Sequence, residues 1–441
     1  MKILKLLARL FLTSTKNNKS ILYYLSVITI FTLPYMNFPF VSAGTIKPLA
    51  LLPLSLVALI DIKMYFKKSS VIFFVIFFIL ILYSLFLSFT LSDEVFNNKP
   101  LRGQYVGLIQ FILLGFFSYL AYYMGRFIIP HYIDLKQFLK FTILAYYPSL
   151  IFGIIHILTV NFGLQNPIFS IRSFVSTTVF PADYYRNMML TVEPSFAAAD
   201  LMVIMLPISL MSFYKMRNIF SAITLVLVII NLLGTKSGLG FVMLASTVIF
   251  LILINFNRLK SIILYIFPLV LFSLVAISSS DYIVNRMLKA EGQTDQSMAT
   301  RYVSYSVGKD IFLDNPLGVG YANEGFYYAE YLPDEYTKLP LFSDWIDPES
   351  KRFPDIKSIL IKFLVSFGII GIILICCLCY FVIRVWLRLG FFCNNNFYSI
   401  VIKIFIINVI IMSLSVSVFG YISIVLLSGY YLSFLKLKGI R

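Results

Sequence analysis

Residues 71–91 read VIFFVIFFILILYSLFLSFTL, a run without a single charged residue. A bilayer core about 30 Å thick needs about 20 apolar residues in helical form, so this run predicts one membrane-spanning helix. The whole chain has the same character. Hydrophobic residues make up 60% of its 441 residues and charged residues only 13%, against about 25% charged residues in soluble domains. This charge is too little to coat a globule in water, which excludes a soluble, disordered or disulfide-stapled secreted protein.

Runs of the same kind predict about 12 transmembrane helices. The runs are continuous rather than alternating, which favours helices over the strands of a β-barrel. We therefore expect an all-α, polytopic integral membrane protein that forms a single transmembrane domain over residues 1–441. The second run is short and contains Pro48 and Pro53, which are expected to break it. The predicted spans are residues 21–40, 46–60, 71–91, 104–124, 139–160, 195–213, 218–234, 238–255, 261–280, 359–383, 400–418 and 420–435.

The basic residues indicate the orientation. If the N-terminus faces the cytoplasm, the inner segments hold 21 of the 36 Lys and Arg residues and only two acids, Asp61 and Asp134, a net charge of +19. The outer segments then hold the other 15 basic residues and 18 acids, a net charge of −3. Positive charge gathers on cytoplasmic loops. Both termini are therefore predicted in the cytoplasm, and the net charge of +16 indicates topology rather than nucleic-acid binding.

Three segments outside the spans stand out. Residues 1–20 carry three basic residues on one helical face and predict a cytoplasmic interfacial helix. A cleavable signal peptide is the alternative, but the apolar run that follows is longer than such peptides use. Residues 161–194 and 281–358 form the two long loops, and both are predicted on the outer side. A chain with two such loops is expected to handle a ligand at the outer surface.

Two acids stand at the end of the first long loop, in the stretch Glu193-Pro194-Ser195-Phe196-Ala197-Ala198-Ala199-Asp200. Pro194 followed by small residues predicts a helix start. Asp200 should lie more than a turn below the outer surface, and an ionisable group at that depth is a functional candidate. Two alternatives stay open: Glu193 could complement the helix dipole, and Asp200 could pair with a nearby base or hydroxyl.

The turn Gly234-Thr235-Lys236-Ser237-Gly238 places a Lys among small residues on the outer side. Its backbone amides and its ammonium group suit a phosphate. A plain tight turn with a solvated Lys fits the same residues equally well.

The second long loop contains the signal of a short helix. Arg301, Tyr305 and Lys309 are spaced i, i+4 and i+8, which puts them on one polar face. An Asn-Pro pair and two glycines then end this helix. Aromatic residues and acids follow, a composition that suits either sugar stacking or an aromatic belt at the membrane surface.

At these places the chain resembles the bacterial O-antigen and capsule repeat-unit polymerases of the Wzy type. The run from Glu193 to Phe196 is similar to their E-P-S-F segment. The Lys236 turn is similar to their small-residue turn, where Arg is more usual. The stretch from Arg301 to Gly320 is similar to their R-x-x-x-W…N-P-L-G-x-G segment, with Tyr in place of the frequent Trp. By motif, the resemblance covers about residues 190–240 and 300–320. The family that the chain resembles lies within the wider O-antigen polymerase and ligase superfamily.

The resemblance implies a glycosyltransferase of the bacterial inner membrane, similar to the lipid-linked-sugar (GT-C-like) fold. Such enzymes join undecaprenyl-diphosphate-linked oligosaccharide units on the outer face and move the growing chain from its lipid carrier to a new unit. A chain-length regulator and a flippase would be partners, and no metal or other cofactor is expected. The implied roles are catalytic base for Glu193, binding of the substrate diphosphate for Arg172, Arg186, Lys236 and Arg301, and support for Asp200, Tyr305 and Lys309.

Two other functions share much of this pattern. The related O-antigen ligases have the same architecture, but they are expected to use a His in the large outer loop. This chain has only His131, predicted inside, and His156, within a predicted span. A flippase for the same lipid-linked units would also have about 12 spans, although two long outer loops rich in charged residues are unexpected there.

The Cys376-Cys377-x-Cys379 cluster has no His or carboxylate nearby and is interpreted as small apolar residues rather than a metal site.

Overall fold

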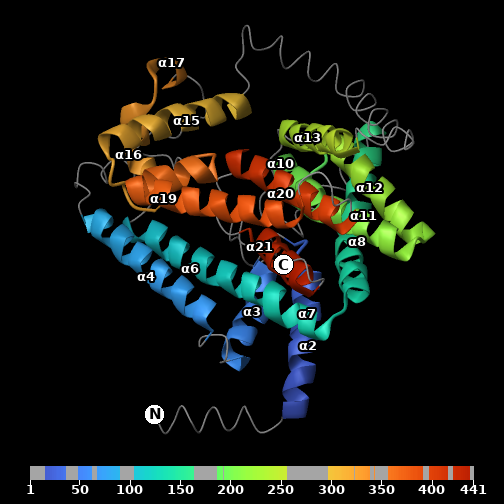
Figure 1. Cartoon of the computed structure of the whole chain (residues 1–441). Helices are drawn as coiled ribbons and strands as arrows, with labels where there is room; N and C mark the ends of the chain where they lie inside the picture. Colours follow the sequence, from blue (N-terminus) through green and yellow to red (C-terminus); the bar gives the residue numbers. More distant parts are fainter. Residues whose placement is uncertain are drawn as a thin grey trace.

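The computed structural model describes residues 15–35, 48–61, 67–89, 104–162, 186–191, 193–255, 296–321, 323–337, 342, 356–390, 397–415 and 421–437. Within them the regular elements are helices, and no strand occurs (Figure 1). The helices are α2 (Thr15–Thr32), α3 (Pro48–Ile60), α4 (Lys68–Phe89), α6 (Gln104–Tyr123), the π-helix η2 (Met124–Ile128), α7 (Ile129–Tyr132), α8 (Leu135–Asn161), α10 (Pro194–Ala199), the π-helix η4 (Asp200–Met205), α11 (Leu206–Met216), α12 (Ile219–Thr235), α13 (Gly238–Asn255), α15 (Gln296–Asp314), α16 (Glu324–Tyr331), α17 (Asp334–Thr337), α19 (Ile359–Arg388), α20 (Phe397–Ser415) and α21 (Ile422–Leu437).

The expectation of an all-helical polytopic membrane protein is confirmed. Six of these helical segments are long and apolar enough to cross a membrane, and shorter apolar helices accompany them. Each predicted span that falls within the described residues is helical, whereas the predicted span at 261–280 lies outside them. Most of the predicted loop 161–194 and most of the predicted interfacial helix 1–20 also lie outside the described residues, as do residues 281–295, 338–341 and 343–355 of the predicted loop 281–358.

The prediction that proline breaks the second span is wrong. The helix α3 begins at Pro48 and continues through Pro53 to Ile60. A proline at the first helical position loses no hydrogen bond, because that amide has no partner inside the helix. Pro53 removes one backbone donor, and the packing of α3 against α2 and α6 holds the helix together there.

The helices differ in how much lipid they face. The helix α4 exposes Val71, Phe78 and Phe89, as expected for a helix at the rim of a bundle in hydrocarbon. The continuous segment α10–η4–α11, in contrast, is enclosed by protein, and all residues of η4 are buried. A helix that is apolar on all sides and covered by its neighbours belongs to the core. Whatever α10 and η4 present to a ligand therefore rests on a rigid support.

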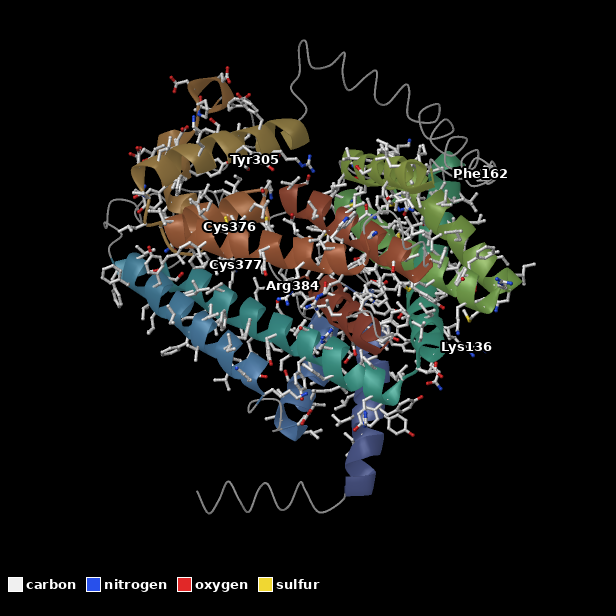
Figure 2. All side chains as sticks on the ribbon, in the orientation of Figure 1. Lys136, Phe162, Tyr305, Cys376, Cys377 and Arg384 are labelled. Carbon is white, nitrogen blue, oxygen red and sulfur yellow. The ribbon has the colours of Figure 1, made fainter. Side chains whose placement is uncertain are left out.

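The helix α8 spans the height of this bundle. Its first turn is closed by a capping box, in which the Asp134 carboxylate accepts from the Gln137 amide at 2.7 Å. Lys136 lies near one end of α8 and Phe162 directly follows the other (Figure 2). With about 1.5 Å of rise per residue, the helix separates its two ends by about 40 Å.

The helices α15, α16 and α17 form a layer at the end of the bundle opposite the start of α2 (Figure 1). This outer layer has its own small core, in which Val303, Val307 and Ile311 of α15 pack with Tyr328 of α16 and Val365 of α19. The tyrosines of the second long loop contribute to that core. The layer rests on α19 through the contacts of α15 and α16 with that helix.

The helix α19 is broken at Gly368, where the backbone has φ 55° and ψ −131°. The segment from Pro316 to Gly320 runs beside the break. The Val319 amide donates to the Val365 carbonyl at 2.9 Å, and the Ile369 amide donates to the Pro316 carbonyl at 2.9 Å. The break therefore leaves these backbone groups satisfied, because the neighbouring segment replaces the lost helical bonds.

Candidate active site

Glu193 lies at the N-cap of α10, directly before Pro194. Its side chain makes no capping hydrogen bond to the helix backbone. Instead, its Oε1 accepts from the Ser195 hydroxyl at 2.5 Å, and the side chain is half-buried. The Glu193 carboxylate is therefore partly accessible at the start of α10. The predicted helix start at Pro194 is confirmed.

Arg186 and Lys236 meet at the turn between α12 and α13. The Arg186 guanidinium donates from Nε to the Thr235 carbonyl at 3.3 Å and from Nη2 to the Lys236 carbonyl at 3.4 Å. Lys236 has a left-handed backbone with φ 47°, and its side chain is exposed. Two predicted phosphate-binding cations are thus brought to one turn.

This turn joins two helices that both contact α10, the helix that begins after Glu193. The short helix α10 packs against α12 and α13. A Cβ at Gly240 of α13 would lie 2.9 Å from the Cβ of Ala198 in α10, so the two helices approach closely. Glu193 therefore begins a helix that packs against both helices flanking the turn of Arg186 and Lys236.

Asp200 is 1% exposed and lies at the start of η4. Its Oδ1 accepts from the Tyr421 hydroxyl at 2.5 Å. The alternative in which Asp200 pairs with a hydroxyl is therefore the one that the structure supports. The π-helix is supported from α20, where the Asn408 amide donates to the Met202 carbonyl at 3.1 Å. A π-helical turn offsets its carbonyls and often marks functional positions.

Arg301, Tyr305 and Lys309 lie on α15, which ends at Asp314 before the Asn-Pro pair, as predicted. The Tyr305 hydroxyl donates to the Leu414 carbonyl at the end of α20, at 2.7 Å. Arg301 is half-buried, and Lys309 is exposed. This second group of basic residues lies on α15, which packs against α16 and α19, whereas Arg186 binds the end of α12 from the segment before α10 and Lys236 directly follows α12.

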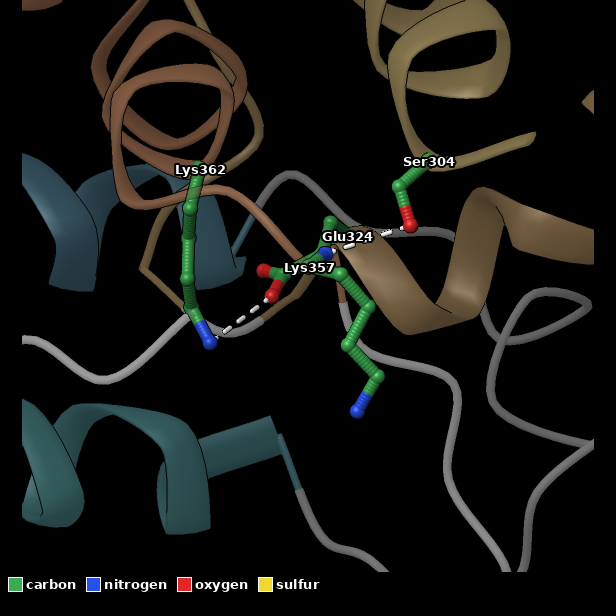
Figure 3. Close-up of polar contacts among 4 residues, drawn as sticks. All are labelled: Ser304, Glu324, Lys357 and Lys362. Carbon is green, nitrogen blue, oxygen red and sulfur yellow. Dashed lines mark hydrogen bonds and ion pairs between the residues drawn. The ribbon is translucent and has the colours of Figure 1, made fainter. Parts of the chain in front are cut away.

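A buried ion pair in the outer layer was not foreseen. Lys362 Nζ of α19 lies 3.1 Å from Glu324 Oε1 of α16, and both side chains are almost fully buried (Figure 3). Lys362 Nζ also lies 5.1 Å from the ring centroid of Tyr321. Next to the pair, the Lys357 amide donates to the Ser304 hydroxyl of α15 at 3.1 Å. The only local signal was a Lys within the first turn of an apolar span.

Two buried asparagines were missed as well. Asn187, next to Arg186, donates to Asn231 Oδ1 of α12 at 2.8 Å. Single amides in a mostly apolar sequence carry no pattern by which reasoning from sequence could pair them.

Three further predictions concern Arg172, a metal site and the cysteines of α19. Arg172 lies outside the described residues. Among the described residues there is no group of three or more His, Cys, Asp or Glu that could hold a metal ion. Cys376, Cys377 and Cys379 are exposed on the apolar helix α19, and the first two are labelled in Figure 2.

Fold and site together define the class. The chain is a polytopic helical membrane protein with a helical layer at one end, and Arg186 and Lys236 meet at the turn that follows α12.

Residues 223–376 match the family described as O-antigen ligase, and this match supports placing the chain in the O-antigen ligase and polymerase superfamily, whose members are glycosyltransferase-like enzymes. The match covers roughly a third of the chain. It includes the Lys236 turn, α15 and the N-terminal half of α19, whereas Glu193, Arg186 and Asp200 precede it. No curated protein and no solved structure matches the chain.

Proposed function

We propose that this protein is a repeat-unit polymerase that joins undecaprenyl-diphosphate-linked oligosaccharides on the outer face of the bacterial inner membrane. The observation that carries this proposal is the meeting of Arg186 and Lys236 at the α12–α13 turn, beside the helix that begins at Glu193. A diphosphate leaving group needs fixed positive charge, and an attacking sugar hydroxyl needs a proton acceptor.

The reaction breaks the bond between the anomeric carbon of the growing chain and the diphosphate of its carrier. The hydroxyl of a new lipid-linked unit attacks that carbon and loses its proton to Glu193. The leaving undecaprenyl diphosphate takes the electron pair of the broken bond, and Arg186 and Lys236 stabilise its charge. In this scheme Arg301 on α15 contacts a second phosphate group or the sugar chain. The proton acceptor and the cations in this scheme are side chains of the protein itself.

An O-antigen ligase is the second candidate, because the family that matches residues 223–376 is described by that activity. A ligase would transfer the finished chain to a different acceptor and would not extend it. We favour the polymerase because the large outer loop contains no His.

A deletion strain separates these candidates. Loss of a polymerase should leave single repeat units on the surface glycan and on the carrier. Loss of a ligase should leave long chains on the lipid carrier. A flippase is tested with the purified protein, which should convert lipid-linked units into longer chains in detergent. An unchanged glycan ladder in the deletion strain would overturn the proposal.

A further inference from the structure

A pair of buried amides joins three parts of the chain next to the proposed diphosphate site. Asn187 and Asn231 are 2% and 0% exposed. The Asn187 amide nitrogen donates to Asn231 Oδ1 at 2.8 Å. Asn231 in turn donates to the carbonyl of Leu150 in α8 at 3.1 Å and to that of Leu227 in α12 at 2.8 Å. The pair therefore ties the segment before α10 to both α8 and α12.

The polar groups of Asn187 itself are also engaged. Its backbone amide donates to the Gly234 carbonyl at 2.8 Å, and its side-chain Oδ1 accepts from the Met189 amide at 2.9 Å. Met189 has a left-handed backbone with φ 50°, which is unusual for a residue with a side chain. These bonds set the path of the chain on both sides of Asn187.

The surrounding helices leave space for this pair. A Cβ at Gly153 of α8 would lie 1.9 Å from Asn231 Oδ1 and 2.9 Å from Asn187 Nδ2. A Cβ at Gly234 would lie 3.3 Å from the Asn187 Cβ and 2.4 Å from Ile157 of α8. Both glycines thus sit where any larger residue would collide with the amide pair or with α8. The glycines of α8 and α12 therefore leave the room in which the two amide side chains lie.

Arg186 is the residue directly before Asn187, and its guanidinium reaches the carbonyls of Thr235 and Lys236. We propose that the Asn187–Asn231 pair positions Arg186 on the α12–α13 turn, so that Arg186 and Lys236 form one preorganised receptor for the donor diphosphate. The inference rests on the proposed function and adds to it the residues that fix the site. A long Arg side chain loses much rotamer freedom on binding. A backbone anchored one residue away removes part of that loss before the ligand arrives.

A purely structural role for the amide pair is the alternative. It would make Asn187 important for folding, with an effect on ligand binding that is independent of Arg186. A double-variant cycle distinguishes the two roles, because the effects of two changes that act through one group are not additive.

The experiment uses the full-length protein in nanodiscs and undecaprenyl diphosphate as the probe, with undecaprenol as the control lipid. Asn187→Asp is the informative variant because it keeps the size of the side chain. Its ionised carboxylate faces the Asn231 Oδ1 and repels it, whereas its protonated form donates a hydrogen bond as the amide does. Protein is purified at pH 5.5, and binding is measured between pH 5.5 and 8 relative to wild type at each pH.

The matched control is Asn218→Asp. Asn218 also lies on α12, at its other end, where its Oδ1 caps the helix by accepting from the Ser221 amide at 3.0 Å. Asp is an equally good N-cap, so this variant should bind like wild type at every pH.

Three results are expected. Arg186→Ala should weaken binding of undecaprenyl diphosphate about 10- to 150-fold, the range for loss of a charge-assisted hydrogen bond. Asn187→Asp should bind about tenfold or more weakly at pH 8 and recover toward wild type at pH 5.5. The double variant should bind no more weakly than Arg186→Ala alone.

The outcomes that overturn the two proposals differ. If wild type binds undecaprenyl diphosphate no better than undecaprenol, the proposed function of this site is wrong. If Arg186→Ala weakens binding but Asn187→Asp adds its own separate loss at pH 8, the positioning role is wrong while the site stands. Should Asn187→Asp fail to accumulate, Asn187→Ser, which keeps a shorter donor, enters the same cycle. Additive losses there would likewise overturn the positioning role.

Discussion

At the scale of single residues, the structure distinguishes two acids that the sequence places on the same helix. Glu193 is half-exposed at a helix start and has a hydroxyl as its neighbour, whereas Asp200 is buried beneath it and bound to Tyr421. The accessible acid suits proton transfer with a substrate, and the enclosed acid suits support of the helix around it.

Glu193→Gln should therefore slow turnover by about 10²- to 10⁴-fold, the usual contribution of a general base, because it keeps the shape and removes the proton acceptor. The measurement is chain elongation by purified protein on lipid-linked units. Ser195→Ala is the matched control, since it removes the hydroxyl and keeps the carboxylate, and it should retain most activity. A Glu193→Gln protein that accumulates normally and elongates like wild type would exclude the base role.

The buried pair of Glu324 and Lys362 leads to a prediction of stability. Removal of one partner of a buried pair leaves the other charge uncompensated, which costs about 3–5 kcal/mol. Glu324→Gln should accordingly lower the thermal unfolding midpoint in detergent, and Glu324→Gln combined with Lys362→Met should recover most of that loss. Glu330→Gln, an exposed change on the same helix, is the control. A midpoint equal to that of the control would mean that the pair contributes no stability.

Tyr331 in the outer layer provides a test of pH dependence. Burial, followed by the hydrogen bond from its hydroxyl to Asp314 Oδ2 at 2.9 Å, raises the pKa of Tyr331 to about 12. The unfolded-state pKa is about 10. The stabilisation is therefore fully present below pH 10 and is lost as the pH rises through about 12.

Tyr331→Phe should thus lose less stability than wild type between about pH 10 and 12, measured as the shift of the unfolding midpoint. Tyr302→Phe, an exposed change on α15, should follow the wild-type curve. Parallel curves for wild type and Tyr331→Phe would show that this tyrosine does not contribute.

At the scale of elements, the Pro316–Gly320 segment and the broken helix α19 depend on each other. Gly318 has φ 89°, and a Cβ there would lie 2.6 Å from the Ser366 carbonyl oxygen. Gly368 has φ 55°, and a Cβ there would lie 2.1 Å from the Pro316 carbonyl oxygen. The two backbones approach so closely that side chains at these positions do not fit. The outer layer is therefore attached to the bundle through backbone contact.

Gly318→Ala should destabilise the protein by about 1–3 kcal/mol from backbone strain alone, with a further loss from the collision with α19. The unfolding midpoint of the purified protein measures this effect. Gly238→Ala is the matched control, because nothing lies within 4 Å of a Cβ built there, and it should change stability by no more than about 0.5 kcal/mol. Equal midpoints for the two variants would contradict the close approach.

At the scale of the whole molecule, charge and shape lead to one orientation. The segments predicted in the cytoplasm carry a net charge of +19 and the others −3, as counted above. The layer of α15, α16 and α17 lies at the end of the bundle opposite the start of α2 (Figure 1). We therefore expect this layer outside and Lys136, at the start of α8, inside.

Single cysteines test that orientation in a background in which the four native cysteines are replaced. Glu335→Cys in α17 should react with an impermeant thiol reagent in intact spheroplasts, whereas Lys136→Cys should react only after the membrane is opened. Both side chains are exposed, so access to the reagent depends on the membrane alone. Protection of position 335 in intact spheroplasts would invert the topology and, with it, the proposed location of the site.

The sequence alone determined those features that depend on neighbours along the chain. Most apolar runs have the length and composition of a membrane-spanning or membrane-buried helix, and this follows from the residues of each run alone. Local residues also determined where two helices are bounded. Pro194 predicted a helix start, and the Asn315-Pro316 pair predicted a helix end. The predicted break of the helix at Pro53 was wrong, because the support that α2 and α6 give to α3 is not local.

Only the tertiary structure decided which polar groups meet. Asn187 and Asn231, Asp200 and Tyr421, and Glu324 and Lys362 are each joined across long stretches of sequence. An isolated amide, hydroxyl or charge in an apolar chain carries no mark of its partner. In a medium without water, however, burial of each such group is costly unless a partner is supplied. The packing of the helices supplies these partners, and it thereby brings Arg186 to the turn of Lys236, between the two helices against which α10 packs.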